Sequence, residues 1–285
     1  MATPNYLHEH FALRAFERHL ATLIEKPLAH TVASGERIRS AAGPVSMIGY
    51  MAKHNVYNRE ALRLIEAGAI GAPAAMTGAR LGYRRLDGDW RRAPATSGLG
   101  GLADLGIYPV LTAVDVFGGD PVRCQATGWP MRDRGETDVY AQATLWFDDH
   151  RYLHFETSAS IDLRKAPPGD IDLQRPSGEV CTYTVIGDRG LIQVDGSWQM
   201  NGLGSLTVCD AAGWRPVELV PADPYLSQYR LLAACSSGEQ VPRALSLDRG
   251  LADLAILHAI ADNAAAASGI TRIESFDQDR MVPTC

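Results

Sequence analysis

Asp104 and Tyr108 are the side chains whose types and spacing first point to chemistry. They lie four positions apart in the segment SGLGGLADLGIYP (residues 97–109), and residues at that spacing share one face of a helix. A carboxylate beside a phenol can bind a hydroxyl group and transfer its proton. Pro109 should bend the helix beside the tyrosine, because proline cannot donate a backbone hydrogen bond. The segment therefore predicts two ligand-facing side chains, with a helix-capping aspartate and a packed tyrosine as the alternatives.

The same segment also matches a nucleotide-binding pattern. Gly98, Gly100 and Ala103 fit G-x-G-x-x-[G/A], the fingerprint that places a pyrophosphate at a helix N-terminus. A working fingerprint follows a buried strand, whereas the residues before Gly98, DGDWRRAPATS, are polar and contain Pro94. We therefore predict that a helix begins near Gly101 and that the glycines leave room for a substrate, not for a pyrophosphate.

Lys26 is the third candidate, because it closely follows the apolar stretch at residues 21–24. This stretch is typical of a strand, and ligands bind at the carboxyl ends of strands in α/β sheets. A phenol with an unperturbed pKa near 10 is a poor base at neutral pH, so Tyr108 would need a nearby ammonium group. We expect Lys26 to supply it, with an ordinary surface lysine as the alternative.

Other polar residues are less specific. Lys53 and His54 follow the second apolar strand, and they would either line a substrate cleft or belong to a polar loop. His8 and His10 resemble a metal-binding pair, but residues two apart do not face each other on a helix, so we predict no metal site. The five cysteines include no C-x-x-C spacing, which favours reduced thiols over a zinc site or a disulfide framework.

The composition restricts the class of protein. With 285 residues, 46% hydrophobic and 21% charged, the chain can form one large domain or two ordinary ones. A net charge of −6 with scattered arginines argues against a nucleic-acid partner, because phosphate contacts need clustered Lys and Arg. The N-terminus lacks the pattern of a signal peptide, and no apolar run reaches the roughly 18 residues of a membrane helix. We expect a cytoplasmic protein that binds a small-molecule substrate and no membrane.

The order of the expected elements divides the chain after residue 72. Residues 1–72 alternate between helix and strand, which predicts an α/β unit with a parallel sheet. Residues 73–285 hold mostly strands with period-two alternation, which predicts an α+β domain with a mainly antiparallel sheet. The first unit has a helix capped by Thr3, strands at 21–24 and 45–50, and helices at 31–41 and 58–67. The second has strands at 74–80, 121–128, 138–147, 151–160, 181–186, 190–195, 205–209 and 216–220, and helices at 101–117 and 245–267.

Several motifs, in this order and spacing, resemble one enzyme family. They are Thr3-Pro4-Asn5 with His8, Glu25-Lys26-Pro27-Leu28, Gly49-Tyr50-Met51, Gly68-Ala69-Ile70-Gly71, Gly100-Gly101 with Asp104, Gly106, Tyr108 and Pro109, and GDRGLIQV at 187–194. Together with the last helix they cover nearly the whole chain, and they resemble the Gfo/Idh/MocA oxidoreductases of the glucose–fructose oxidoreductase and inositol dehydrogenase type. The resemblance implies a partial Rossmann-type parallel sheet, followed by an α+β domain with a large, mainly antiparallel sheet.

The resemblance also implies a reaction and a set of site residues. It implies hydride transfer between NAD or NADP and a hydroxyl-bearing carbon of a sugar, polyol or dihydrodiol, with Tyr108 as proton acceptor or donor and Lys26 and Asp104 as catalytic partners. The cofactor would contact Pro4, Asn5, His8, Glu25, Lys26 and Pro27. The substrate would contact Lys53, His54, Gly100, Gly101 and Asp104. Members of the family often pair through the sheet of the second domain, which implies a homo-oligomer.

One part of the family pattern is missing from these residues. A chain similar to this family is expected to begin with a strand, a G-x-G-x-x-[G/A] turn and further strand–helix units, roughly 80 residues in all. Met1 corresponds to the end of the fourth strand, so we expect the adenosine half of the cofactor site to lie outside this sequence.

Three explanations of the missing part stay open. The natural chain is longer, or another chain supplies the missing half, or the protein is an inactive member that binds a sugar-like ligand or serves as an oligomeric scaffold. The strand segments TLI and VSMIG carry no charges that would protect an exposed sheet edge, which favours a longer chain.

Overall fold

Two parallel strands form the sheet of the N-terminal part of the chain. β1 (Thr22–Glu25) pairs with β2 (Ser46–Gly49), as the sequence predicts. The terminal ammonium group of Met1 donates to the Leu23 carbonyl (2.6 Å), and the Met1 carbonyl accepts from the Glu25 N–H (3.0 Å), so the first residue runs alongside β1. The computed structural model describes the following parts of the chain: residues 1–82, 90–130, 138–159, 179–199, 201–267 and 269–274.

Side-chain caps mark the starts of two helices in this part of the chain. Thr31 Oγ1 accepts a hydrogen bond at the start of α2, and Asn55 Oδ1 accepts one at the start of α3. The expected cap of the first helix by Thr3 is wrong, because the chain enters that helix through a 3₁₀ turn that has no side-chain cap. The helical elements of this part are η1 (Asn5–Leu7), α1 (His8–Phe16), α2 (Val32–Ser40), η2 (Met51–His54) and α3 (Val56–Glu66).

The rest of the chain forms a nine-stranded sheet in the order β10-β9-β8-β7-β3-β6-β5-β4-β11. Its neighbouring strands are antiparallel except for β3 and β6, so the mainly antiparallel sheet expected from the sequence is confirmed. The strand expected at 216–220 is misplaced, because the β9–β10 hairpin turns over two residues and the return strand starts sooner. The strands are β3 (Pro73–Leu81), β4 (Arg123–Pro130), β5 (Asp138–Trp146), β6 (Tyr152–Ser158), β7 (Val180–Gly187), β8 (Leu191–Asp195), β9 (Ser205–Asp210), β10 (Gly213–Pro216) and β11 (Thr271–Arg272).

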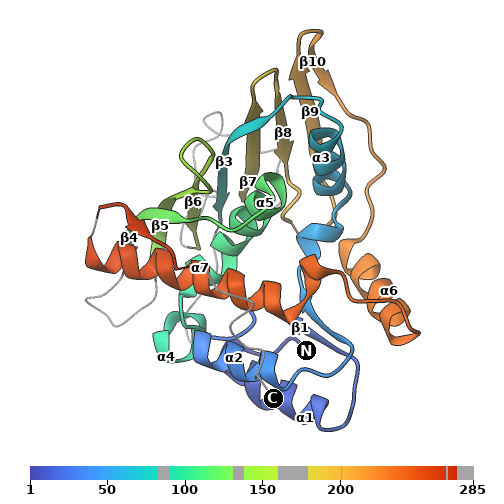
Figure 1. Cartoon of the computed structure of the whole chain (residues 1–285), viewed down its shortest axis with the longest axis vertical. Helices are drawn as coiled ribbons and strands as arrows, with labels where there is room; N and C mark the ends of the chain where they lie inside the picture. Colours follow the sequence, from blue (N-terminus) through green and yellow to red (C-terminus); the bar gives the residue numbers. More distant parts are fainter. Residues whose placement is uncertain (83–89, 131–137, 160–178, 200, 268, 275–285) are drawn as a thin grey trace, which may run out of the picture.

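Two helices pack on the large sheet. α5 (Ile107–Phe117) packs on β3 and β6, and α7 (Leu247–Ala266) packs on β4. Figure 1 shows α7 crossing the middle of the molecule, where it also contacts α2 and β2 of the N-terminal part. Since the C-terminal helix packs on both parts, the division after residue 72 stays a prediction.

The core helix that carries Asp104 and Tyr108 is not α-helical throughout. After Gly100 and Gly101 it contains a π-helical turn, η4 (Leu102–Gly106), which continues into α5. The whole helical segment Ala95–Phe117 is, within the described residues, the one stretch long and apolar enough to cross a membrane, and 83% of its apolar window is buried. Burial under the large sheet identifies it as a core helix of the fold.

One long helix was not expected from the sequence. α6 (Pro224–Ser236) begins at Asp223, whose Oδ1 accepts from the N–H groups of Tyr225 (2.8 Å) and Leu226 (3.1 Å). Shorter helical elements are η3 (Trp90–Arg92), α4 (Pro94–Ser97) and η7 (Arg243–Leu245).

Candidate active site

A cleft of about 460 Å³ lies where the carboxyl end of β1 meets the core helix and the end of β3. Lys26 enters it from β1, Asp104 from η4 and Tyr108 from α5. These are the three residues that the sequence analysis proposes as catalytic, and Lys26 is 78 positions away from Asp104 in the chain. The fold therefore brings the three side chains together in one cleft.

Lys26 is held by both the side chain and the backbone of Asp104. Its Nζ donates to Asp104 Oδ1 (2.8 Å) and to the Asp104 carbonyl oxygen (2.5 Å). In a π-type turn this carbonyl would accept from residue 109, but Pro109 has no N–H. The π-helical turn and the proline thus leave a backbone acceptor at the cleft, and Lys26 uses it.

The charges around Lys26 keep its ammonium group protonated. Burial by itself would lower the pKa of Lys26, but the Asp104 carboxylate beside it raises that pKa above its ordinary value. Nζ lies 4.8 Å from the centroid of the Tyr108 ring. The pKa of Glu25 is raised above that of a solvated carboxyl. Burial raises this pKa by more than the nearby Lys26 ammonium lowers it.

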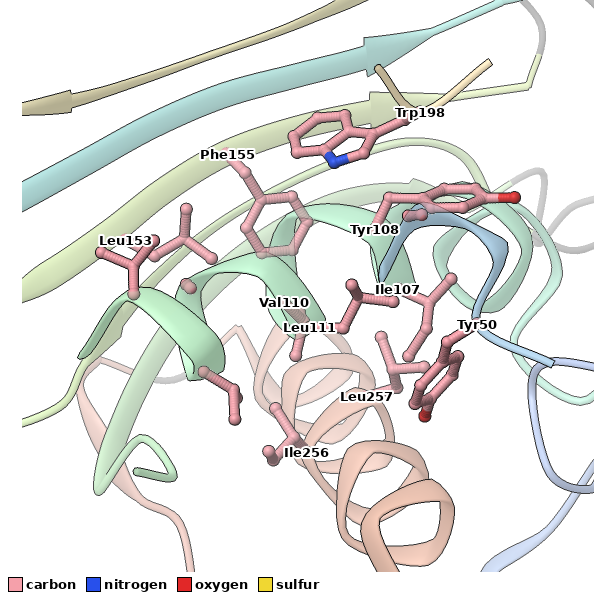
Figure 2. Close-up of a cluster of buried hydrophobic side chains, with 14 of the residues drawn as sticks. Tyr50, Ile107, Tyr108, Val110, Leu111, Leu153, Phe155, Trp198, Ile256 and Leu257 are labelled. Carbon is pink, nitrogen blue, oxygen red and sulfur yellow. The ribbon is translucent and has the colours of Figure 1, made fainter. Parts of the chain in front are cut away.

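Tyr108 is held by an aromatic stack that reaches into the core. Its ring stacks on Trp198 at 6.5 Å between centroids, and Trp198 stacks on Tyr183 at 5.1 Å. Trp198 Nε1 donates to Thr112 Oγ1 (3.1 Å), and Thr112 Oγ1 donates to the Tyr108 carbonyl (2.9 Å). Figure 2 shows the Tyr108 hydroxyl pointing away from the packed apolar side chains. The ring is therefore fixed, and its reactive end is directed out of the core.

The N-terminal residues predicted to bind the cofactor fall into two groups. Asn5, Glu25 and Lys26 line the cleft. Pro4, His8 and Pro27 are not among the described residues that line it. His8 is buried, and its ring nitrogens lie 2.9–3.2 Å from three backbone carbonyl oxygens, including that of Pro27. His8 thus joins the N-terminal turn to the loop that follows β1.

The residues predicted to bind the substrate are mostly placed elsewhere. Lys53 lines a second cavity of about 280 Å³, where it pairs with Asp115. His54 is not among the described residues that line the cleft, and neither are Gly100 and Gly101, which are both buried. Of this predicted set, only Asp104 lies in the cleft.

The expected role of Gly98 in leaving room for a substrate is wrong. A Cβ atom on Gly98 would lie 2.3 Å from the backbone oxygen of His30, and its φ of +71° favours glycine. This glycine allows a close approach between two segments of the chain itself.

Several residues that the sequence analysis did not select as site residues also line the cleft. Among them are Arg80, Arg91, Trp198 and Tyr225. Arg91 Nε lies 3.8 Å from Asp104 Oδ2. Burial raises the pKa of Tyr225 to about 12, and the neighbouring Tyr108 and Glu25 act in the same direction. A start signal for the helix of Tyr225 was present in the sequence as Asp223-Pro224.

Comparison with known proteins shows the family to which this chain belongs. Residues 58–193 match the family model of the GFO/IDH/MocA C-terminal domain. Over 266 residues the chain is 30% identical to an uncharacterized oxidoreductase of Rhizobium meliloti, which covers 90% of this chain and 74% of that protein. The chain belongs to the Gfo/Idh/MocA oxidoreductase family.

Other Gfo/Idh/MocA relatives differ in how much of their length this chain spans. A D-xylose 1-dehydrogenase [NADP(+)] of Haloarcula marismortui is 32% identical over 172 residues, which is 57% of this chain and 48% of that enzyme. The crystal structure of the aldose-aldose oxidoreductase from Caulobacter crescentus, complexed with glycerol, superposes with a TM-score of 0.82 at 25% identity. That superposition covers 95% of this chain and 77% of the other, so the Gfo/Idh/MocA fold extends over nearly all of this sequence.

Proposed function

We propose that this protein is an NAD(P)-linked oxidoreductase that acts on a hydroxyl-bearing carbon of a sugar or polyol. The observation that carries the proposal is the convergence of Lys26, Asp104 and Tyr108 in one cleft of a Gfo/Idh/MocA chain. The two relatives named for D-xylose and aldoses support a sugar as the substrate class.

The cleft has polar groups that fit the nicotinamide end of such a cofactor. Thr3 Oγ1 is buried and has no hydrogen-bond partner within the described residues, although Thr3 lines the cleft. Asn5 and Glu25 lie on the same wall, beside the carboxyl end of β1, where parallel sheets bind ligands. We propose that Thr3, Asn5, Glu25 and Lys26 hold the nicotinamide, which when bound would supply the hydride acceptor or donor.

Tyr108 would take the proton of the substrate hydroxyl as the carbon is oxidised, and return it in the reverse direction. The Lys26 ammonium, 4.8 Å from the Tyr108 ring, stabilises the phenolate that forms. Asp104 keeps Lys26 charged and in place through the 2.8 Å ion pair. Because Trp198 and Thr112 fix the ring, Tyr108 needs no reorganisation before the proton moves.

An assay of the purified chain with a panel of substrates tests this function. We expect D-xylose, D-glucose, myo-inositol or related compounds to reduce NAD⁺ or NADP⁺, followed by the absorbance of the reduced nicotinamide. Tyr108→Phe keeps the ring and its stacking but should lower kcat by about 10²- to 10⁴-fold, the usual worth of a general base. NADH and NADPH fluorescence titrations show in parallel which cofactor the chain binds.

The outcomes separate this function from the alternative of an inactive family member. Sugar binding without turnover and without cofactor binding, found also for the natural protein isolated from its own cells, would support a ligand-binding or scaffold role and overturn the proposal. Turnover that survives in Tyr108→Phe would remove the tyrosine from the mechanism. A cytoplasmic location and a homo-oligomer remain predictions, which fractionation and light scattering can check.

A further inference from the structure

Arg80 is a buried arginine that lines the candidate active-site cleft. It lies on β3, where positions 76, 78 and 80 lie on the face toward the core helix and the side chains of Met76 and Arg80 are buried. Gly78 leaves the space that the Trp198 ring occupies, since a Cβ there would lie 3.2 Å from the indole. Arg80 is only 3% exposed, yet it contributes to the same wall as Tyr108 and Trp198. A guanidinium group is thus fixed close to the proposed reaction centre.

The hydrogen-bonding capacity of this guanidinium is only partly used. Nη2 forms an ion pair with Glu179 Oε2 at 2.8 Å. Nε and Nη1 are buried and have no hydrogen-bond partner within the described residues. Buried donors without partners cost free energy, and arginine is the side chain whose planar fork suits oxygen acceptors. The unused donors therefore suit a ligand that brings oxygen atoms into the cleft.

We infer that Arg80 binds an oxygen of the substrate that neighbours the reacting hydroxyl group. This inference rests on the proposed function, because it places the reacting hydroxyl at Tyr108. The acceptor is either a neutral hydroxyl, as in an aldose, or a carboxylate, as in a sugar acid. Glu179 holds the guanidinium in place and partly balances its charge, so either acceptor can be recognised. Arg80 would thereby select substrates with adjacent oxygen atoms over simple alcohols.

Binding measurements that need no turnover test this role. The probes are D-glucose, 2-deoxy-D-glucose, which lacks the neighbouring oxygen, and D-gluconate, which carries a carboxylate. Isothermal titration calorimetry gives the Kd of each for the wild type and for Arg80→Lys, which keeps the charge but loses the fork. We expect Arg80→Lys to weaken D-glucose or D-gluconate about 10- to 100-fold and 2-deoxy-D-glucose less than threefold, as for a lost hydrogen bond to a charged group.

A matched variant separates ligand binding from a structural role. Glu179→Gln keeps an oxygen acceptor for Nη2 and leaves Arg80 intact, so it should retain the preference for D-glucose or D-gluconate over the deoxy sugar. A larger effect on D-gluconate identifies a carboxylate as the acceptor, whereas a larger effect on D-glucose identifies a hydroxyl. Equal losses for all three probes, or no measurable binding of D-glucose and D-gluconate to the wild type, would overturn the inference.

The same probes distinguish this inference from the function on which it rests. If the wild type discriminates the probes through Arg80 but no cofactor is reduced, the hydride-transfer function fails and the Arg80 site stands. If cofactor reduction depends on Tyr108 but Arg80→Lys changes the kcat/KM of all substrates equally, the Arg80 site fails and the function stands.

Discussion

Replacing Lys26 by methionine isolates the electrostatic contribution of this residue. The substitution keeps an unbranched side chain of similar length but removes the ammonium group that lies 4.8 Å from the Tyr108 ring. At about 5 Å and an effective dielectric constant of about 20, an ammonium and a phenolate attract each other by about 3 kcal/mol. We therefore expect Lys26→Met to lower kcat by about 10²-fold.

The assay compares the kcat of the wild type with that of each Lys26 variant, measured on the best substrate of the panel. It uses kcat because KM also depends on substrate binding. Lys26→Arg restores the charge and should recover most of the rate, which a purely structural role of the lysine carbon chain would not explain. Lys26→Met also leaves Asp104 without its ion-pair partner, so melting by circular dichroism must show that the variant is folded at the assay temperature. A folded Lys26→Met variant with kcat within threefold of the wild type would refute the electrostatic role.

Three further substitutions test other parts of the account. His54→Gln should flatten the acid side of the stability profile: burial, with Arg59 and Lys53 nearby, lowers the pKa of His54 to about 4. The contribution of neutral His54 is therefore fully present above pH 6.5 and is lost as the pH falls from 6.5 toward 4, by less than about 1.4 kcal/mol per pH unit because solvent screens the partly exposed ring, as urea titrations can show. Gly98→Ala should destabilise the protein by more than about 2 kcal/mol, because of its φ and the close His30 oxygen. Gly118→Ala, at a position with a similar φ but open space, should destabilise the protein by only about 1 kcal/mol. Equal decreases in Tm for the two variants would contradict the clash expected at Gly98. Trp198→Phe should lower the free energy of unfolding by about 2 kcal/mol and reduce kcat, whereas an unchanged kcat would show that the stack does not position Tyr108.

The elements of the fold could be predicted where the pattern of the sequence is local. Thr31 and Asn55 cap helices, and the alternation of apolar residues in the strands matches one buried face of a sheet. The start of α6 was missed, although Asp223 followed by Pro224 is a start signal, because the residues after it lack a clear apolar period. The π-helical turn before α5 could not be predicted, since it involves the Asp104 carbonyl, to which Pro109 cannot donate and to which the distant Lys26 does.

The candidate site could be predicted only in part, and for a physical reason. Lys26, Asp104 and Tyr108 stand at ends of elements and have reactive side chains, so residue type and position select them. Arg80 is the residue before the last in β3, and in an alternating strand a charged residue is usually expected on the solvent face. The two-residue period of a strand places positions 76 and 80 on one face, but only the packed fold shows that this face is the buried one.

The positions of Lys53 and His54 could not be predicted from the sequence either. Both follow β2, and neighbouring parallel strands bring their carboxyl ends to the same edge, which made a shared cleft with Lys26 a reasonable expectation. The 3₁₀ turn η2 that follows Tyr50 instead carries Lys53 toward Asp115 on α5. The sequence pattern does not contain the direction of that turn.

Transfer of deuterium tests the central claim most directly. The substrate of highest turnover is deuterated at the carbon that bears the reacting hydroxyl, and the cofactor is recovered and analysed by mass spectrometry and NMR. The account predicts one deuterium atom at C4 of the reduced nicotinamide with the wild type, and a rate lower by about 10²-fold or more with Tyr108→Phe. Reduced cofactor without deuterium, or a deuterium transfer rate that is the same in Tyr108→Phe, would contradict the claim that this cleft carries out the reaction.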